Sequence, residues 1–337
     1  MGVGSINLIR VFSLTALSFL LAILWTPGLS HVLYKYKIVK QLRERTWDGD
    51  PAKLFRAMHK DKKGTPTMGG ILIWLTTAAV TILFNLSRPQ TWLPVFVLIA
   101  SGILGAIDDW LNVRGVVRGL SARIKFLFQF LIAGLGAWWF FYKLEFSEIR
   151  VPGAGIWGSP HTVDIGWFYI PLFVLTVVFL TNAVNITDGL DGLAGGTLAA
   201  SFAAVMGIAL VQNQIGIAAF AGTIIGALLA FLWFNIYPAR FFMGDTGAFA
   251  LGATLAVLAF LTKSVLLLPF IAFVFCVEAA SSLTQWLAKR FFRRKIFLIA
   301  PLHHHFEALG WPETKVTMRF WVVAAVMATI GMIIAFI

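Results

Sequence analysis

Acidic residues stand at the ends of long apolar segments, where carboxylates are unexpected. Asp108 and Asp109 are adjacent, Asp188 and Asp191 lie three residues apart, and Asp245 precedes a Thr-Gly pair. A carboxylate near hydrocarbon costs roughly 2.5–3.5 kcal/mol unless a cation or hydrogen bonds compensate it. Capping of a helix end would explain any one of these acids, but not all of them together. The acids therefore indicate a site for a cation or a phosphate.

Amide side chains accompany these acids. Asn182 and Asn185 are spaced to share a helix face, and Asp188 and Asp191 extend this stripe if the helix persists. Asn235 opens the polar segment that leads to the last of the acids. The spacing does not fit a calcium-binding loop of the twelve-residue type, because no glutamate closes it. We expect these oxygens to bind a ligand.

A glycine-rich basic run is typical of anion binding. Residues 62–70 read Lys-Lys-Gly-Thr-Pro-Thr-Met-Gly-Gly. Lys62 and Lys63 would supply charge and Thr67 a hydroxyl group, while N–H groups exposed at the glycines would precede a helix N-terminus. The run lacks the spacing of a P-loop, so we expect a phosphate contact without a P-loop fold.

Half of the six histidines are consecutive, as His303, His304 and His305. Consecutive residues of a helix point in different directions, so these three do not form a zinc cage. A chance cluster is the alternative, and we interpret them as contacts for a phosphate or a sugar. Carboxylate and amide oxygens without thiolates favour Mg²⁺, which proteins hold with one or two carboxylates while phosphate oxygens complete its shell.

The composition is that of a membrane protein. The chain has 337 residues, of which 59% are hydrophobic and 12% charged. These values exclude a soluble domain and a disordered chain. A transmembrane barrel is disfavoured because runs such as 225–233 are apolar at every position, without the alternation of a barrel strand. Cys276 is the only cysteine, which excludes a disulfide within the chain or a thiolate metal cage.

Ten apolar segments have the length of a membrane span. We therefore expect an all-α polytopic membrane protein in which residues 1–337 form one integral membrane domain. The first segment is interpreted as an anchor and not as a cleaved signal peptide. Alternating residues between the fourth and fifth segments predict a small external β-hairpin within 143–166. The predicted spans are 8–30, 68–87, 91–109, 124–142, 167–184, 193–212, 215–234, 247–263, 265–287 and 318–337.

Basic residues predict the orientation. The net charge is +12, and most of the 27 lysines and arginines fall in the segments that follow the odd-numbered spans. The positive-inside rule places these segments in the cytoplasm and both termini outside. Most of the acids share the cytoplasmic face, so we expect the site there, with a membrane lipid as one substrate and a soluble nucleotide-linked group as the other. Binding to anionic headgroups explains much of the positive charge, and we expect no nucleic-acid partner.

The order of these motifs resembles the bacterial phospho-N-acetylmuramoyl-pentapeptide transferases, a family within the polyprenyl-phosphate N-acetylhexosamine-1-phosphate transferases. The paired Asp108-Asp109 is typical of the superfamily, and the runs 62–70 and 301–307 are typical of the family. The resemblance implies transfer of phospho-N-acetylmuramoyl-pentapeptide from its UDP derivative to undecaprenyl phosphate, which gives lipid I and UMP. It also implies dependence on Mg²⁺, a cytoplasmic cleft in the bacterial inner membrane and a homodimer.

The resemblance also implies roles for individual residues. Asp245 would bind Mg²⁺, Asp108 and Asp109 would handle the lipid phosphate, and Asp108 would be the favoured base. Phe242 would stack on the uracil. The other residues expected to bind substrate are Lys62, Thr67, Lys125, Asn182, Asn185, Asp188, Asp191, Asn235, Gln285, His303, His304 and His305.

One position departs from the family pattern. The family commonly has a lysine three residues after the second acid of the pair, where this chain has Asn112. Either Arg114 or Lys125 supplies the missing charge, or a lysine is dispensable at that position.

Two alternative functions are considered. A sibling transferase that uses UDP-N-acetylglucosamine would share the acids, although the histidine run favours the muramoyl donor. A secondary transporter would place polar groups at the middle of the membrane. Only Glu278 fits that description, and it could equally be a helix residue whose hydrogen bonds are satisfied within the protein.

Overall fold

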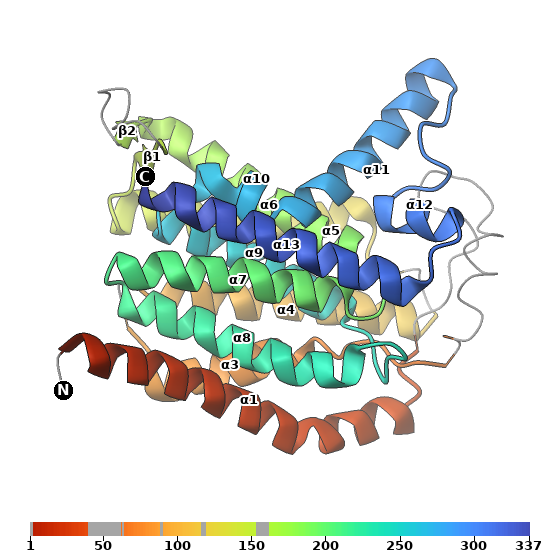
Figure 1. The fold of residues 1–337 in the computed structure, drawn as a ribbon, viewed down its shortest axis with the longest axis horizontal. Helices are drawn as coiled ribbons and strands as arrows, with labels where there is room; N and C mark the ends of the chain where they lie inside the picture. The colour runs from red at the N-terminus through yellow and green to blue at the C-terminus, as the bar shows by residue number, and fades with distance from the viewer. Residues whose placement is uncertain (1–2, 40–61, 63, 88–89, 116–118, 153–161) are drawn as a thin grey trace.

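The computed structural model describes residues 3–39, 62, 64–87, 90–115, 119–152 and 162–337. Figure 1 shows long helices that lie side by side, with both termini at one end. The elements are α1 (Val3–Lys35), α3 (Ile71–Phe84), α4 (Trp92–Val113), α5 (Ala122–Trp138), η2 (Trp139–Lys143), β1 (Glu148–Arg150), β2 (Thr162–Asp164), η4 (Gly166–Phe168), α6 (Tyr169–Thr187), α7 (Leu193–Val211), α8 (Ile215–Asn235), α9 (Gly244–Leu261), η5 (Val265–Leu267), α10 (Leu268–Ile271), α11 (Phe273–Phe292), α12 (Leu302–Ala308) and α13 (Glu313–Phe336).

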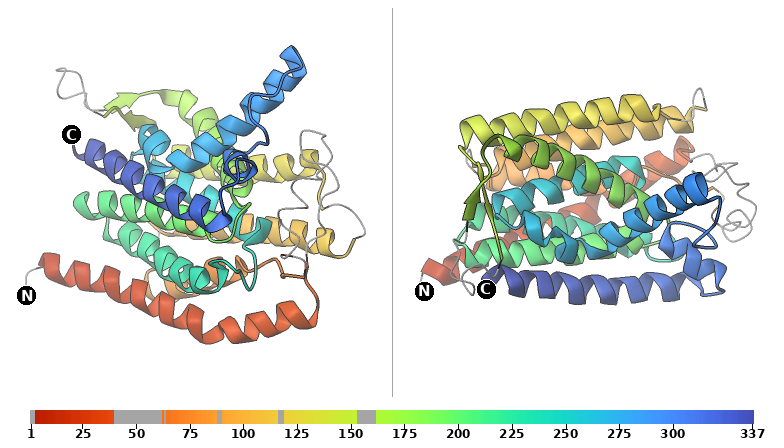
Figure 2. Two further views of the ribbon diagram at one scale, coloured as in Figure 1. Left: turned by 45° about the vertical axis from the view of Figure 1, so that its right-hand side comes forward. Right: turned by 90° about the horizontal axis from the view of Figure 1, so that it is seen from above.

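The expectation of a helical multi-pass membrane protein is confirmed. Within the described ranges, 8 helices are long and apolar enough to cross a membrane, or 9 if one bent pair counts as a single span. That pair is Val265–Ile271 with Phe273–Phe292, bent by 84°. The sequence predicts one continuous span over 265–287, whereas the chain leaves the helix at Ala272. Figures 1 and 2 show α11 projecting away from the other helices.

The predicted span 68–87 is shorter than expected. Helix α3 has 14 residues, about 21 Å at 1.5 Å per residue, against about 30 Å of hydrocarbon. The helix starts at Ile71, after Met68, whose φ of +70° is not helical, and the N–H groups of Gly69 and Gly70 donate to the carbonyls of Phe242 and Met243. The count of ten spans therefore remains a prediction.

The predicted hairpin is confirmed as a pair of short strands, and its position outside the membrane remains a prediction. β1 pairs antiparallel with β2, with Ile149 opposite Val163. Residues 153–161, between the two strands, lie outside the described residues. Lys263, which follows α9, forms an ion pair of 3.1 Å with Glu148 on β1. The hairpin and both termini occupy one end of the molecule (Figure 1), as the even number of predicted spans requires.

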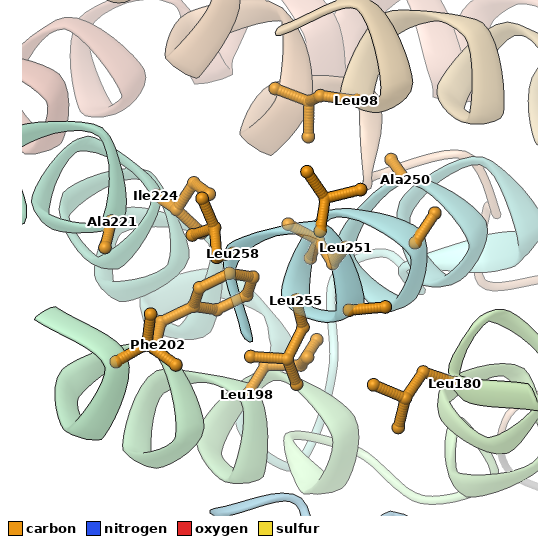
Figure 3. Packing of buried hydrophobic residues seen from close by; sticks show 14 of the residues in the cluster. Leu98, Leu180, Leu198, Phe202, Ala221, Ile224, Ala250, Leu251, Leu255 and Leu258 are labelled. Atoms are coloured by element: carbon orange, nitrogen blue, oxygen red, sulfur yellow. The ribbon is translucent and has the colours of Figure 1, made fainter. Parts of the chain in front are cut away.

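Helix α9 is the centre of the helical core. All of its residues from Gly244 to Leu261 are buried. A helix that is apolar on every face has to be surrounded by other helices, and its many alanines and glycines allow close approach. Figure 3 shows Leu251, Leu255 and Leu258 among side chains of α4, α6, α7 and α8. The position of α9 fixes the position of its N-terminus, where Asp245 lies.

Candidate active site

The N-terminus of α9 collects acidic side chains from two other segments. Asp188, directly after α6, accepts the N–H of Gly244 at 3.2 Å. Asp109, on α4, accepts the N–H of Thr246 at 3.1 Å. The first N–H groups of a helix have no partner within the helix and carry partial positive charge, so carboxylates are stabilised there. These acids cap α9 from outside, whereas Asp245 is the acid that α9 itself contributes.

A lysine on α5 joins two of the acids. Lys125 Nζ lies 2.6 Å from Asp108 Oδ2 and 3.1 Å from Asp245 Oδ2. Asp108 also accepts the N–H of Leu120 at 2.6 Å. Both carboxylates are almost completely buried, and carboxylates of this kind need a paired cation. Arg114 instead lies over the ring of Trp110, 4.5 Å from its centroid. Of the two basic candidates, Lys125 and not Arg114 pairs with Asp108; that it replaces the lysine which the family has at the position of Asn112 stays a prediction.

A second ion-pair cluster contains Glu313, a residue that the sequence analysis did not single out. Lys62 Nζ lies 2.6 Å from Asp191 Oδ1 and 2.5 Å from Glu313 Oε1. Asp191 also accepts the N–H of Ala239 at 3.0 Å. The Lys62 ammonium lies 5.8 Å from the centroid of the Phe242 ring. This cluster brings the basic run, the Asp188–Gly192 turn and the start of α13 together.

Gly244, at the start of α9, lies close to Asp109, Asp188 and Thr67. Its φ of +75° favours glycine. A Cβ at this position would collide with Asp109 Oδ2 and would lie 2.6 Å from the hydroxyl of Thr67. Asp109, Asp188 and Asp245 therefore lie at the start of α9, Asp108 shares Lys125 with Asp245, and Asp191 pairs with Lys62.

Two local expectations were wrong. Helix α6 ends at Thr187, so Asp191 is in the following turn and does not extend the stripe of Asn182 and Asn185. The N–H groups of Gly69 and Gly70 are bound to backbone carbonyls and are not free to bind an anion. Lys62 and the buried Thr67 hydroxyl remain as the candidate anion contacts of that run; Lys63 lies outside the described residues.

The amide side chains have different surroundings. Asn235 accepts the N–H of Gly192 at 3.0 Å and donates to the carbonyl of Phe241 at 2.9 Å, so it joins two loops of the site. Asn182 donates to Gln129 Oε1 at 2.8 Å. Gln129 lies one turn after Lys125 on α5 and was missed, although a polar residue inside an apolar span is a signal of function. Asn185 is half-buried at the end of α6.

The histidines and Gln285 hold the segment before α13 in place. His303 is fully buried against Glu278, with His303 Nδ1 and Glu278 Oε2 3.0 Å apart. His305 Nδ1 accepts the N–H of Leu298 at 3.2 Å. Gln285 Oε1 accepts the backbone N–H groups of Ile296 and Phe297 at 3.0 Å each, so this side chain binds the loop after α11. Both oxygens of Glu278 have partners within the protein. This favours a helix residue with internally satisfied hydrogen bonds over a transporter site.

The donor set suits a metal that is completed by phosphate. Within the residues described above, no three Asp, Glu, His or Cys side chains could hold a metal ion by themselves. Asp108 and Asp245, from α4 and α9, nevertheless place carboxylate oxygens around one cation, the Lys125 ammonium. Hard oxygen donors in this number fit Mg²⁺, which usually takes one or two carboxylates and fills its remaining positions with substrate phosphate and water.

Burial makes one acid of the site sensitive to pH. Burial raises the pKa of the Glu307 carboxyl from 4.5 to about 7, and the nearby carboxylate of Glu313 adds to the shift, whereas the Lys62 ammonium opposes it. Glu307 Oε2 lies 2.7 Å from Nδ1 of His304.

Glu307→Gln is expected to flatten the dependence of stability on pH. A carboxyl with a raised pKa in the folded state favours folding at low pH, and this contribution is lost as pH rises from about 4.5 to about 7. Tm in detergent should therefore fall less between about pH 5 and about pH 8 for the variant than for the wild type. Parallel Tm curves for the two proteins would contradict the assignment.

Comparisons with known proteins show the family of this chain. Residues 91–263 match the model of glycosyl transferase family 4, and residues 62–73 match signature 1 of phospho-N-acetylmuramoyl-pentapeptide-transferase. Proteins of that name are similar to this chain over nearly its whole length. The one from Chloroflexus aggregans is 41% identical over 98% of this chain and 91% of its own length. Those from Geobacillus thermodenitrificans and Bacillus subtilis are 39% and 37% identical over 95% and 94% of this chain, and over 96% and 95% of their own lengths. The chain belongs to the phospho-N-acetylmuramoyl-pentapeptide-transferase family.

Proposed function

We propose that this protein transfers phospho-N-acetylmuramoyl-pentapeptide from its UDP derivative to undecaprenyl phosphate, a step of peptidoglycan synthesis that gives lipid I and UMP. The observation that carries the proposal is the Lys125 ammonium shared by Asp108 and Asp245, which joins α4, α5 and α9 in one buried ionic centre. The second cluster, around Lys62, provides another cationic contact beside Phe242. The family to which the chain belongs supports the substrates.

The chemical step depends on cancelling charge. An oxygen of the lipid phosphate attacks the sugar-linked phosphorus of the donor, and the bond to the UMP oxygen breaks. A phosphate monoester has a second pKa of about 6, so the lipid phosphate that acts as the nucleophile is already mostly deprotonated at neutral pH. Catalysis therefore depends on bringing two anions together and on in-line positioning.

The residues of the site have distinct tasks in this step. Lys125 and Lys62 are the ammonium groups that cancel phosphate charge. Asp245 would hold Mg²⁺, which supplies further charge neutralisation on the phosphate oxygens when bound. Asp108 is also positioned to accept the remaining proton of a monoprotonated lipid phosphate, a modest contribution. Phe242 is placed for stacking with the uracil beside Lys62.

The surroundings of the site complete the proposal. Residues 1–337 would form one domain of ten spans in the bacterial inner membrane, with the termini and the hairpin outside and the site facing the cytoplasm. The basic segments predicted on that side support this orientation. The protein would act as a homodimer, as the resemblance implies; cross-linking in membranes would test this state.

Release of UMP is the direct test. Purified protein in detergent, given undecaprenyl phosphate and UDP-N-acetylmuramoyl-pentapeptide, should release UMP with Mg²⁺ and lose that activity with EDTA. UDP-N-acetylglucosamine in place of the muramoyl donor should give little UMP. Higher turnover with UDP-N-acetylglucosamine would favour the sibling transferase, and uptake into vesicles without UMP release would favour a transporter.

A further inference from the structure

Three polar residues on one face of α11 hold the segment that carries the histidines. Glu278, Ser281 and Gln285 follow one another at intervals of three and four residues, the spacing of one helix face. Ser281 Oγ accepts the N–H of Leu302 at 3.1 Å. Gln285 Nε2 donates to the carbonyl of Phe297 at 3.0 Å. Figure 1 shows that α12, which contains the histidines, lies beside α11.

Glu278 serves one residue with both of its oxygens. Oε1 accepts the backbone N–H of His303 at 3.0 Å, and Oε2 lies 3.0 Å from Nδ1 of the same residue. Both side chains are 0% exposed. An ionised carboxylate has acceptors only, so the proton between it and the ring sits on Nδ1.

The other ring nitrogen of His303 faces the site. Nε2 is buried and makes no hydrogen bond to the part of the chain that the structure describes. A Cβ at position 189 would collide with this nitrogen, so the ring packs directly against the turn that follows Asp188. A buried polar atom without a partner is unfavourable, because it has lost its hydrogen bonds to water.

We propose that Glu278 is a positioning residue for the phosphotransfer, which makes this inference dependent on the function proposed above. Glu278 fixes the His303 ring in one orientation with its proton on Nδ1. The ring then supports the turn that carries Asp188 and Asp191, and it directs an unprotonated Nε2 toward that turn. A carboxylate inside a membrane helix is costly, and this role accounts for its presence there.

Glu278→Gln separates the tautomer from the shape of the side chain. The backbone N–H of His303 needs the one remaining oxygen as its acceptor, so the amide NH₂ of the glutamine faces Nδ1 and donates to it. The ring proton must then move to Nε2. ¹⁵N NMR of the full-length protein labelled at histidine should show the Nδ1–H form for His303 in the wild type and the Nε2–H form in the variant.

The NMR signals can be assigned within the same protein. The chain has six histidines, and His303→Asn removes the signals of that residue alone. An Nε2–H form of His303 in the wild type would overturn the proposal. This measurement does not depend on catalysis, so it still reports on Glu278 if the wild type releases no UMP, a result that would count against the proposed function alone.

Kinetics test whether Glu278 acts through His303. Glu278→Gln should lower kcat by about 10-fold to 100-fold with a smaller change in KM, the usual size for a residue that orients a functional histidine. In a His303→Asn background, where the amide nitrogen replaces Nδ1, the same substitution should cause little further loss. Equal losses in both backgrounds would show a structural role and overturn the proposal.

Two further variants calibrate this experiment. Glu278→Asp keeps the charge and should recover part of the kcat lost with glutamine. Ser282→Ala changes a buried polar residue of the same helix whose hydroxyl has no partner within the described residues, and it should leave kcat near that of the wild type. Loss of kcat in the serine variant equal to that in Glu278→Gln would show that any polar change in α11 has this effect, and would contradict the proposal.

Discussion

Asp245→Asn is expected to lower UMP release by about 10³-fold, whereas Asp108→Asn should lower it less than about 10²-fold. Both variants keep the shape of the side chain and remove one charge beside Lys125. Asp245 is the acid that α9 contributes, and it is the residue proposed to bind Mg²⁺. Asp108 contributes little to the rate as a base, because the lipid phosphate is mostly deprotonated at neutral pH.

The ranking is measured as kcat at saturating Mg²⁺ and saturating substrates. Asp164→Asn is the matched control, because Asp164 is an exposed carboxylate on β2, at the hairpin end of the molecule, and accepts the N–H of Gly166 at 2.8 Å. That variant should keep wild-type turnover. Equal turnover of the Asp245 and Asp108 variants would refute the ranking and the division of roles behind it.

The acids could be found from sequence, because a carboxylate beside an apolar segment is costly wherever the fold puts it. The same argument applied to Glu313 would have found the second partner of Lys62, since this glutamate also begins an apolar helix. The apolar segments could be located for the same reason, since the bilayer sets their length. Spacing alone could not show that α3 starts only at Ile71, because Met68 has a positive φ and Gly69 is bound to a loop far away in the chain.

The pairing of charges could not be predicted from the chain order. The sequence left open whether Arg114, Lys125 or neither supplies the charge missing at Asn112, and the packing of α5 beside α4 is what pairs Lys125 with Asp108. Gln285 has the residue type of a substrate contact, but its side chain binds a loop that follows its own helix. Side chains that position other groups have the same composition as those that bind ligands, so the sequence predicts the membership of a site better than it predicts roles.

Gly105→Ala is expected to displace Asp245 without touching any ionisable group. A Cβ at position 105 of α4 would collide with the carbonyl group of Asp245 and would lie 2.5 Å from the Cα of Thr246. These are backbone atoms in the first turn of α9. This helix is buried along its whole length and has no free space into which it could move. Overpacking of this kind costs about 1–3 kcal/mol. A displacement of roughly 1 Å at a reacting group costs about 10²-fold in rate.

Gly134→Ala is the matched control for this variant. Gly134 is also within a helix, α5, but a Cβ there would meet no atom within 4 Å. Alanine favours a helix over glycine by about 1 kcal/mol at both positions, so the two variants differ in the collision alone. The Tm and the rate of UMP release should both fall for Gly105→Ala, and neither should fall for Gly134→Ala. Wild-type UMP release from Gly105→Ala would mean that the contact between α4 and α9 does not set the position of Asp245, and that the ionic centre around Lys125 is held by its charges alone.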